Sequence, residues 1–286
     1  MGRERPPVRQ SLRLLATVWT AEGRQPPRLY AALAHGQFFF GERTRYLNLG
    51  YWDGAASFDE AGDALAEQLG LAAGMLEGDT VLDVGFGFGD QDEYWLRRFR
   101  PARIVGLNLT PLHVESARQR FPDPRLDFRL GSATAIELPD ASVDRVTALE
   151  CAFHFRTRED FFREAFRVLR PGGSLATADV LPWQARAPLP ARLLARASRA
   201  VFQIPRENWY ESEAYRRRLE QAGFVDVDVR SIRDRVIRPC WRAMRRLLRS
   251  PAGARRFDWL SRQAGWIPDR WWDALDYVLA AAHKPG

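Results

Sequence analysis

The stretch "VLDVGFGFGDQD", residues 81–92, places three glycines directly after an apolar run that carries one aspartate. Gly85, Gly87 and Gly89 alternate with bulky residues, and glycine is needed where the backbone approaches another group closely or adopts a positive φ. A glycine-rich turn between a strand and a helix brings backbone N–H groups beside a ligand. The stretch therefore predicts a ligand-binding turn at the end of a first strand.

Around this turn, short apolar runs alternate with amphipathic helical stretches from about residue 79 to 180. This alternation is typical of a parallel sheet with helices on both faces. Strands are predicted at 79–84, 102–108, 125–133, 142–150 and 174–180, and helices at 91–100, 112–120 and 157–170. Downstream, the pattern predicts a helix and a strand within 212–232, a helical insertion over 239–275 and a final strand at 276–284.

Length and composition narrow the class of protein. The 286 residues, 46% hydrophobic and 28% charged, fit a globular protein. With only two cysteines, a disulfide framework is not expected, and a reducing, cytoplasmic setting fits. No apolar run is long enough for a membrane helix, and no signal-peptide cleavage site is evident. The net charge of +7 favours solvated helix surfaces, with an anionic substrate, an acidic partner or a membrane surface as the alternatives.

Two nucleotide-binding motifs compete for the glycine stretch. A dinucleotide fingerprint would need glycine at position 90, where this sequence has Asp90, and a carboxylate there would repel a pyrophosphate. A phosphate-binding P-loop is also absent, because no Gly-Lys-Ser/Thr follows. A cationic ligand, in contrast, tolerates nearby carboxylates such as Asp83 and Asp90.

The G-x-G-x-G spacing after "LDV" resembles motif I of the class I S-adenosylmethionine-dependent methyltransferases. Further blocks look like one branch of that family, whose members methylate sterols, tocopherols, phosphoethanolamine bases and glycosylated natural products. These blocks are "YLNLGYWD" (46–53), "GLNLTPLHVESAR" (106–118), "GSATAIELPDASVDRV" (131–146), "LECAFHF" (149–155) and "REAFRVLRPGGSLATADV" (163–180). The resemblance covers roughly residues 40–232.

The resemblance implies a Rossmann-like α/β fold with a mostly parallel seven-stranded sheet. We predict one methyltransferase domain over residues 1–286: a helical N-terminal cap (1–70), a cofactor-binding core (71–180) and a substrate-side lid with the C-terminal strands (181–286). We expect S-adenosylmethionine as cofactor, a small-molecule acceptor as partner, no nucleic acid and no membrane insertion. Oligomers are left open.

Cofactor contacts are carried over from the family position by position. Asn108 stands where many members have an acidic ribose ligand, and Ser132 and Ala133 stand where the family contacts adenine. The residues expected to bind the cofactor are Asp83, Gly85, Gly87, Gly89, Gln91, Asn108, Leu109, Ser132, Ala133 and Glu150. Tyr51 and Trp52 are expected either to close over the cofactor or to be simply core residues. No metal-ligand cluster is expected.

Catalytic groups are expected at the carboxyl ends of strands four and five, where ligands bind in open α/β sheets. His154 is the candidate base or substrate contact, and several family members have histidine there. Asp179 would orient His154 in a His–Asp pair, and Glu150 would face the cofactor or bond backbone. A surface or helix-capping role for His154 and a structural role for Asp179 remain the alternatives.

These expectations converge on a methyltransferase that acts on a small, fairly apolar acceptor, with a natural-product hydroxyl as first choice. Carbon or nitrogen of a terpenoid, sterol-like or lipid-amine acceptor is the alternative. A cyclase that keeps the cofactor as a scaffold is another, because fold does not fix function. Tryptophans near the expected acceptor side hint at a bulky acceptor or at core packing: Trp183, Trp209, Trp241, Trp266, Trp271 and Trp272.

Overall fold

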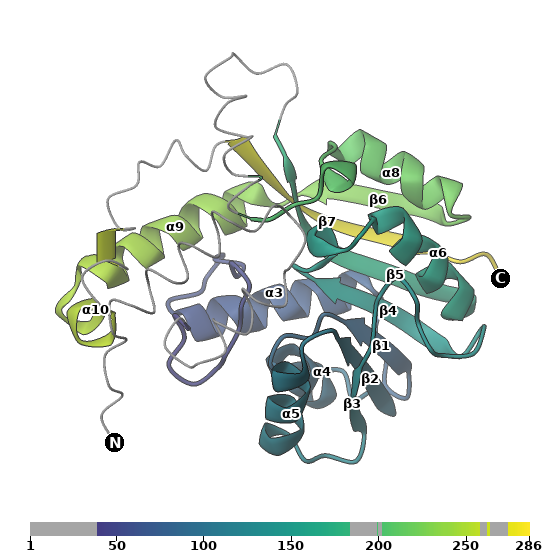
Figure 1. Ribbon diagram of the computed structural model, residues 1–286, viewed down its shortest axis with the longest axis horizontal. Coiled ribbons are helices and arrows are strands. Elements are labelled where there is room, and N and C mark those ends of the chain that lie inside the picture. The colour runs from purple at the N-terminus through teal and green to yellow at the C-terminus, as the bar shows by residue number, and fades with distance from the viewer. Residues whose placement is uncertain (1–38, 184–198, 200–201, 258–261, 264–273) are drawn as a thin grey trace.

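A seven-stranded sheet forms the centre of the computed structural model, which describes residues 39–183, 199, 202–257, 262–263 and 274–286 (Figure 1). The strands run in the order β3-β2-β1-β4-β5-β7-β6. Their bounds are β1 Thr80–Val84, β2 Arg103–Asn108, β3 Leu126–Leu130, β4 Val143–Leu149, β5 Leu169–Pro182, β6 Val225–Ser231 and β7 Leu275–His283. Strands β1 to β5 pair in parallel, whereas β7 runs antiparallel to both of its neighbours. The expected seven-stranded, mostly parallel sheet is confirmed.

Helices connect these strands where the sequence pattern places them. Their bounds are α3 Phe58–Ala72, α4 Asp90–Arg98, α5 Pro111–Arg120, α6 Arg158–Val168, α8 Ser212–Gln221, α9 Arg233–Arg249 and α10 Pro251–Arg256, with short 3₁₀ turns η1 Ala152–His154 and η2 Arg206–Asn208. The start of α6 has a clear local cause, since the Thr157 side chain accepts the N–H of Asp160 as an N-cap. Pro111 occupies the first turn of α5, where its missing N–H costs nothing.

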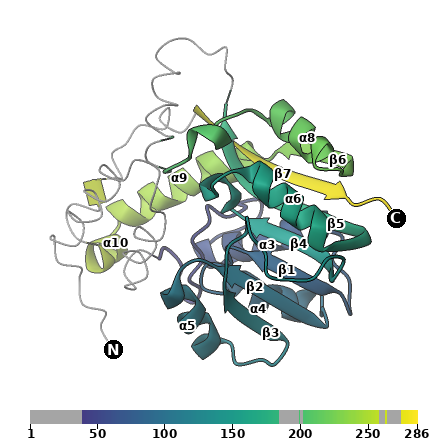
Figure 2. The ribbon, with the colours of Figure 1, turned by 45° about the vertical axis from the view of Figure 1, so that its right-hand side comes forward.

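Side-chain alternation along the strands creates a core on each face of the sheet. In β1, Leu82 and Val84 pack on the side of α6 and α8, together with Phe162. Val81 points to the other side, where it packs with Trp95 of α4 and with α3. The ribbon views show α6 and α8 on one face of the sheet and α3 and α4 on the other (Figures 1 and 2). Both faces of the buried strands are therefore covered.

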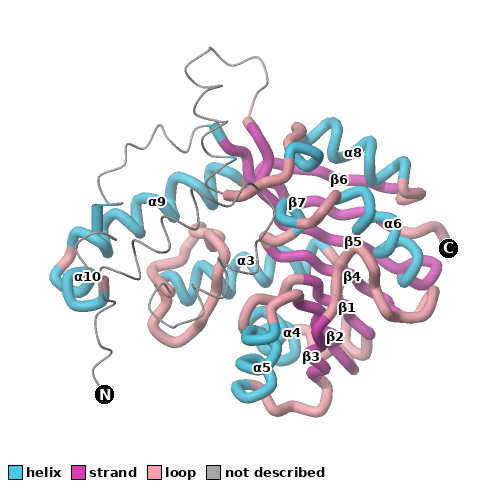
Figure 3. The backbone as a smooth tube through the Cα atoms, in the orientation of Figure 1, coloured by secondary structure: helices cyan, strands magenta, loops and turns pink. Residues whose placement is uncertain are grey.

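The N-terminal segment departs from the sequence-based expectation. Residues 39–57 contain no helix, so the prediction of a helical cap around "FFFGERTRYLNLGYW" is wrong for this part (Figure 3). Backbone contacts to side chains organise the segment instead, because the Asp59 carboxylate accepts the N–H groups of Glu42 and Thr44 at 3.0 and 2.9 Å. Residues 1–38 lie outside the described part of the chain.

The arm formed by α9 and α10 extends away from the sheet, with α10 at its far end (Figure 1). It confirms helix in the first part of the predicted 239–275 insertion; residues 258–261 and 264–273, with Trp266, Trp271 and Trp272, lie outside the described chain. None of the helices described is long and apolar enough to span a bilayer.

Candidate functional site

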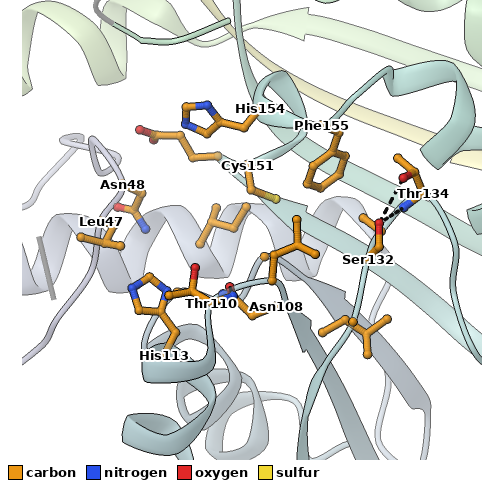
Figure 4. Close-up of a pocket in the computed structure, with 18 of the residues that line it drawn as sticks. Leu47, Asn48, Asn108, Thr110, His113, Ser132, Thr134, Cys151, His154 and Phe155 are labelled. Atoms are coloured by element: carbon orange, nitrogen blue, oxygen red, sulfur yellow. Dashed lines mark hydrogen bonds between the residues drawn. The ribbon is translucent and has the colours of Figure 1, made fainter. Parts of the chain in front are cut away.

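A cavity of about 790 Å³ lies at the carboxyl ends of the parallel strands. Its wall comes from the N-terminal segment 45–48, the glycine loop after β1, the ends of β2, β3 and β4, and the short helix η2. In Figure 4, Asn48 and His113 lie on one side of this cavity and Ser132 and Thr134 on the other. A cavity of this size is typical of a small-molecule site, and its position matches the expected ligand edge of the sheet.

The three glycines of the loop have three different neighbours. All adopt positive φ, at 74°, 58° and 83° for Gly85, Gly87 and Gly89. A Cβ on Gly85 would lie 2.6 Å from the Cys151 sulfur, and one on Gly89 would lie 2.9 Å from the ring of Phe128. Only a Cβ on Gly87 would enter open space, with its nearest neighbour 3.9 Å away. Gly85 and Gly87 line the cavity and Gly89 does not, so the expected ligand contact of Gly89 is replaced by helix packing.

The carboxylates near the loop lie behind the cavity wall. Asp83 is fully buried, and it accepts hydrogen bonds from Thr147 and from Gln91 at 2.8 and 3.1 Å. Burial raises the pKa of Asp83 to about 7, although both hydrogen bonds oppose this shift. Asp90 forms a bidentate pair with Arg120, at 2.7 Å for both contacts. Gln91 lines the cavity, but Asp83 and Asp90 do not, which corrects the expectation that Asp83 lines the cofactor site.

The ends of β2 and β3 supply the polar groups expected for a nucleoside. Asn108 lines the cavity, and its side-chain oxygen accepts the N–H of Thr110 at 3.0 Å, which directs the amide nitrogen elsewhere as a donor. Leu109, Ser132 and Ala133 also line it. The structure therefore brings together all four residues expected at these two strand ends.

In the N-terminal segment, two residues predicted to contact the cofactor do not line the cavity, whereas one residue that the sequence analysis missed does. Tyr51 and Trp52 do not line the cavity: Tyr51 packs against the core, and the Trp52 indole donates to the carbonyl of Leu49. Asn48 lines it instead. Its side-chain oxygen accepts the N–H of Gly50 at 3.1 Å, and its amide nitrogen is buried without a hydrogen-bond partner. A buried donor without a partner in a cavity wall is suited to a ligand acceptor.

His113 is a second missed residue. It is buried on the first turn of α5, lines the cavity and packs against Phe88 at a tilted angle, with 4.3 Å between ring centroids. His113 lies one turn beyond the end of β2, at the edge of the sheet where ligands bind, and this position could have been read from the sequence.

Glu150 ends β4 in a left-handed backbone conformation, with φ of 53°. One carboxylate oxygen accepts both the N–H of Leu49 at 2.8 Å and the hydroxyl of Tyr277 at 2.6 Å. Burial raises the pKa of Glu150 to about 8 despite these two hydrogen bonds. Glu150 thus lines the cavity and ties the N-terminal segment to β4 and β7.

His154 lies one turn beyond Glu150, on η1, and lines the same cavity. Burial and the nearby guanidinium of Arg158 lower the pKa of His154 to about 3, although a hydrogen bond with the backbone of Gln203 opposes this. The imidazole is therefore neutral at physiological pH. A neutral imidazole has one ring nitrogen that can accept a proton.

Asp179 does not pair with His154. Its carboxylate is fully buried and accepts from Arg158 at 2.7 Å, from the Tyr215 hydroxyl at 3.3 Å and from the N–H of Val180 at 2.9 Å. Asp179 is also absent from the cavity wall. The expected His–Asp pair is wrong, because Arg158 at the start of α6 reaches the carboxylate first.

Neither metal ligands nor stacked tryptophans complete the site. No group of three metal-ligating side chains occurs among the described residues. Trp183, Trp209 and Trp241 do not line the cavity, and the buried Trp241 belongs to the interior. The apolar lining comes from other residues, including Leu47, Phe88 and Phe155.

Comparison with known proteins decides the family. Residues 82–177 match a family described as a methyltransferase domain. The chain is 42% identical to erythromycin 3''-O-methyltransferase of Saccharopolyspora erythraea, over 94% of each protein. The chain belongs to the S-adenosylmethionine-dependent methyltransferases. This methyltransferase is also 32% identical to 27-O-demethylrifamycin SV methyltransferase of Amycolatopsis mediterranei, over 76% of its own length and 77% of the relative's.

Solved structures agree on the fold of the methyltransferase. Geranyl diphosphate C-methyltransferase from Streptomyces coelicolor A3(2), in complex with Mg²⁺, geranyl diphosphate and S-adenosyl-L-homocysteine, superimposes with a TM-score of 0.71 at 18% identity, over 92% of this chain and 99% of that one. The [4+2]-cyclase SpnF gives a TM-score of 0.66 at 22% identity, over 99% and 98%. Identities this low show a shared fold alone. The expected class I fold, enzyme class and S-adenosylmethionine cofactor are confirmed.

Proposed function

We propose that this methyltransferase transfers a methyl group to a hydroxyl of a small natural product, with macrolide antibiotics as the first acceptor class. High identity to an erythromycin 3''-O-methyltransferase along nearly the whole chain supports this choice. The observation that carries it is the position of the His154 imidazole in the same cavity wall as the glycine loop. A hydroxyl acceptor loses its proton on methylation and therefore needs a nearby group that can accept that proton.

The residues present fit S-adenosylmethionine at the glycine-loop end of the cavity. Gly87 leaves open the space that a Cβ would fill, and the Asn48 amide nitrogen is a buried donor without a protein partner. We propose that Gly85, Gly87, Gln91 and Asn48 hold the methionine part of the cofactor. Asn108, Leu109, Ser132 and Ala133 would hold its nucleoside part. Bound there, S-adenosylmethionine supplies an activated methyl group.

The residues of this protein would align the acceptor hydroxyl with the methyl group and remove the hydroxyl proton. Methyl transfer to oxygen leaves a proton that must depart, and we assign its acceptance to the imidazole of His154. Glu150 holds the N-terminal segment across the cavity through Leu49 and so helps to exclude water. Alignment of the reacting groups supplies much of the rate in such displacements.

The acceptor end of the cavity combines apolar and polar groups. Phe155 and Pro205 offer apolar surface, and Arg156 and Glu207 bring opposite charges to the same wall. This lining suits an amphipathic acceptor.

We expect no nucleic-acid substrate, because "LECAFHF" differs from the Asn/Asp-Pro-Pro-aromatic block of many base-modifying methyltransferases. We also expect the enzyme to act in the cytoplasm.

The decisive experiment incubates the purified protein with S-adenosylmethionine and a panel of macrolides that carry free sugar or ring hydroxyls. We expect S-adenosylhomocysteine and a product heavier by one methyl group, which NMR assigns to oxygen. A methyl on carbon or nitrogen would replace the proposal with the corresponding alternative. Turnover of an acceptor without S-adenosylhomocysteine formation would support a cofactor-retaining cyclase instead.

His154→Ala tests the assigned base. We expect turnover to fall by about 100-fold or more, in the usual range for loss of a general base. Affinity for S-adenosylhomocysteine, measured by calorimetry, should stay unchanged, because His154 is assigned no cofactor contact. Full turnover by this variant would show that another group removes the proton.

A further inference from the structure

Asn208 is a fully buried asparagine whose hydrogen bonds surround the segment that carries His154. Its amide nitrogen donates to the carbonyl of Phe153 at 3.3 Å and to that of Phe155 at 2.8 Å, one residue on either side of His154. Its side-chain oxygen accepts the N–H of Arg158 at 2.9 Å. One amide therefore fixes the backbone immediately before and after the imidazole.

Arg158 connects these hydrogen bonds of the Asn208 side chain, which we call the clamp, to the sheet. Its guanidinium donates to the backbone carbonyl of Asn208, to the Asp179 carboxylate at 2.7 Å and to the carbonyl of Val180 at 2.9 Å. The side chains of Arg158 and Asp179 are both 0% exposed, so neither water nor mobile side chains compete for these contacts. The clamp is thus anchored on β5, a central strand.

The 3₁₀ turn η2, which carries Asn208, also forms part of the cavity wall at the acceptor end. Pro205 and Glu207 line the cavity, and Asn208 follows them directly. The backbone of Gln203, just upstream, hydrogen-bonds to the His154 imidazole. Residues 203–208 therefore contact His154 and the acceptor side of the cavity together.

We propose that Asn208 is a positioning residue that sets the imidazole of His154 against the acceptor hydroxyl. The inference rests on the proposed function, since it concerns the group assigned to proton removal. Asparagine suits this role because its amide donates twice and accepts once, whereas aspartate of the same size cannot donate when ionised. Small displacements of a catalytic group reduce turnover steeply.

The test is a double-mutant cycle with the full-length protein. We expect Asn208→Asp and Asn208→Ala to lower kcat by about 10- to 100-fold, the range that a displacement of about 1 Å produces. Affinity for S-adenosylhomocysteine should change little. In the His154→Ala background, the same substitutions should have almost no further effect on kcat. Arg206→Ala, on the same 3₁₀ turn but exposed and outside the cavity wall, is the matched control and should retain wild-type kcat.

A second measurement does not depend on turnover. Diethyl pyrocarbonate modifies accessible imidazoles, and mass spectrometry follows the rate at each histidine. We expect His154 to react several-fold faster in both Asn208 variants than in the wild type, while His113 of α5 keeps its rate. If the wild type methylates no acceptor, the proposed function fails and this footprint alone decides the role of Asn208.

Three outcomes would overturn the inference. Equal kcat losses from Asn208 substitutions with and without His154 would mean that Asn208 acts elsewhere. Cofactor affinity and kcat that fall in parallel would indicate general loosening of the fold. An unchanged His154 modification rate would show that the clamp does not hold the imidazole.

Discussion

Glu150 is an ionisable residue of the cavity wall whose charge changes near physiological pH. Its pKa of about 8 means that the carboxyl is largely protonated at pH 7 and charged above pH 8. S-adenosylmethionine carries a sulfonium charge that S-adenosylhomocysteine lacks. The ratio of the two affinities should therefore rise in favour of S-adenosylmethionine between pH 7 and 9, by roughly tenfold, which corresponds to an attraction of about 1.4 kcal/mol between carboxylate and sulfonium. Calorimetry across this pH range measures the ratio, and Glu150→Gln should make it flat.

Alanine substitutions at two glycines of the loop should have different effects on ligand binding and on stability. Gly87→Ala places a methyl group in open cavity space, at the cost of about 1–2 kcal/mol for a left-handed alanine. It should weaken S-adenosylhomocysteine binding more than it lowers stability. Gly85→Ala drives a methyl group against Cys151 and should mainly destabilise the fold. Denaturant unfolding and calorimetry on both variants separate these effects; equal loss of stability in both would contradict the assignment of Gly87.

At the scale of elements, the buried pair between Arg158 of α6 and Asp179 of β5 predicts a structural phenotype. Asp179→Asn leaves a buried guanidinium without its counter-ion, which typically costs about 3–5 kcal/mol of unfolding free energy. Urea unfolding should register this loss. A His–Asp pair would instead predict a stable protein with an altered pH dependence of turnover, and that result would restore the original expectation.

The elements also show what the sequence could predict. The strand and helix positions followed from hydrophobic periodicity, and the strand ends therefore located Glu150 and His154 at the ligand edge. Asn108 and Ser132 were predicted from the resemblance to the methyltransferase family. The partner of Asp179 could not be predicted, because it depends on how far the Arg158 side chain reaches from the first turn of α6. Asn48 belongs to the block YLNLGYWD that resembles the family, but its role could not be predicted. That role depends on a local turn in which its side-chain oxygen accepts the N–H of Gly50, so that only its amide nitrogen is left for a ligand.

For the whole molecule, the closing segment 45–52 should respond to ligand binding. Leu49 donates its N–H to Glu150, Tyr51 donates its N–H to Ala61 of α3, and Trp52 donates its N–H to the carbonyl of Arg235 on α9. The segment itself contains no helix or strand. We expect S-adenosylhomocysteine to slow hydrogen exchange of this segment, because a ligand that contacts Asn48 stabilises the closed state by mass action. Peptides from α8, remote from the cavity, serve as the control. Equal slowing in both would indicate global stabilisation only.

The placement of β7 has a consequence for biosynthesis. The ribosome makes β7 after every other strand, yet β7 lies between β5 and β6 and carries Tyr277, the hydroxyl partner of Glu150. Until β7 inserts, β6 has no neighbour in the sheet and Glu150 lacks one of its two donors. A nascent chain can therefore assemble the nucleoside-binding half of its sheet early, but its reaction centre is completed only after β7 has been made.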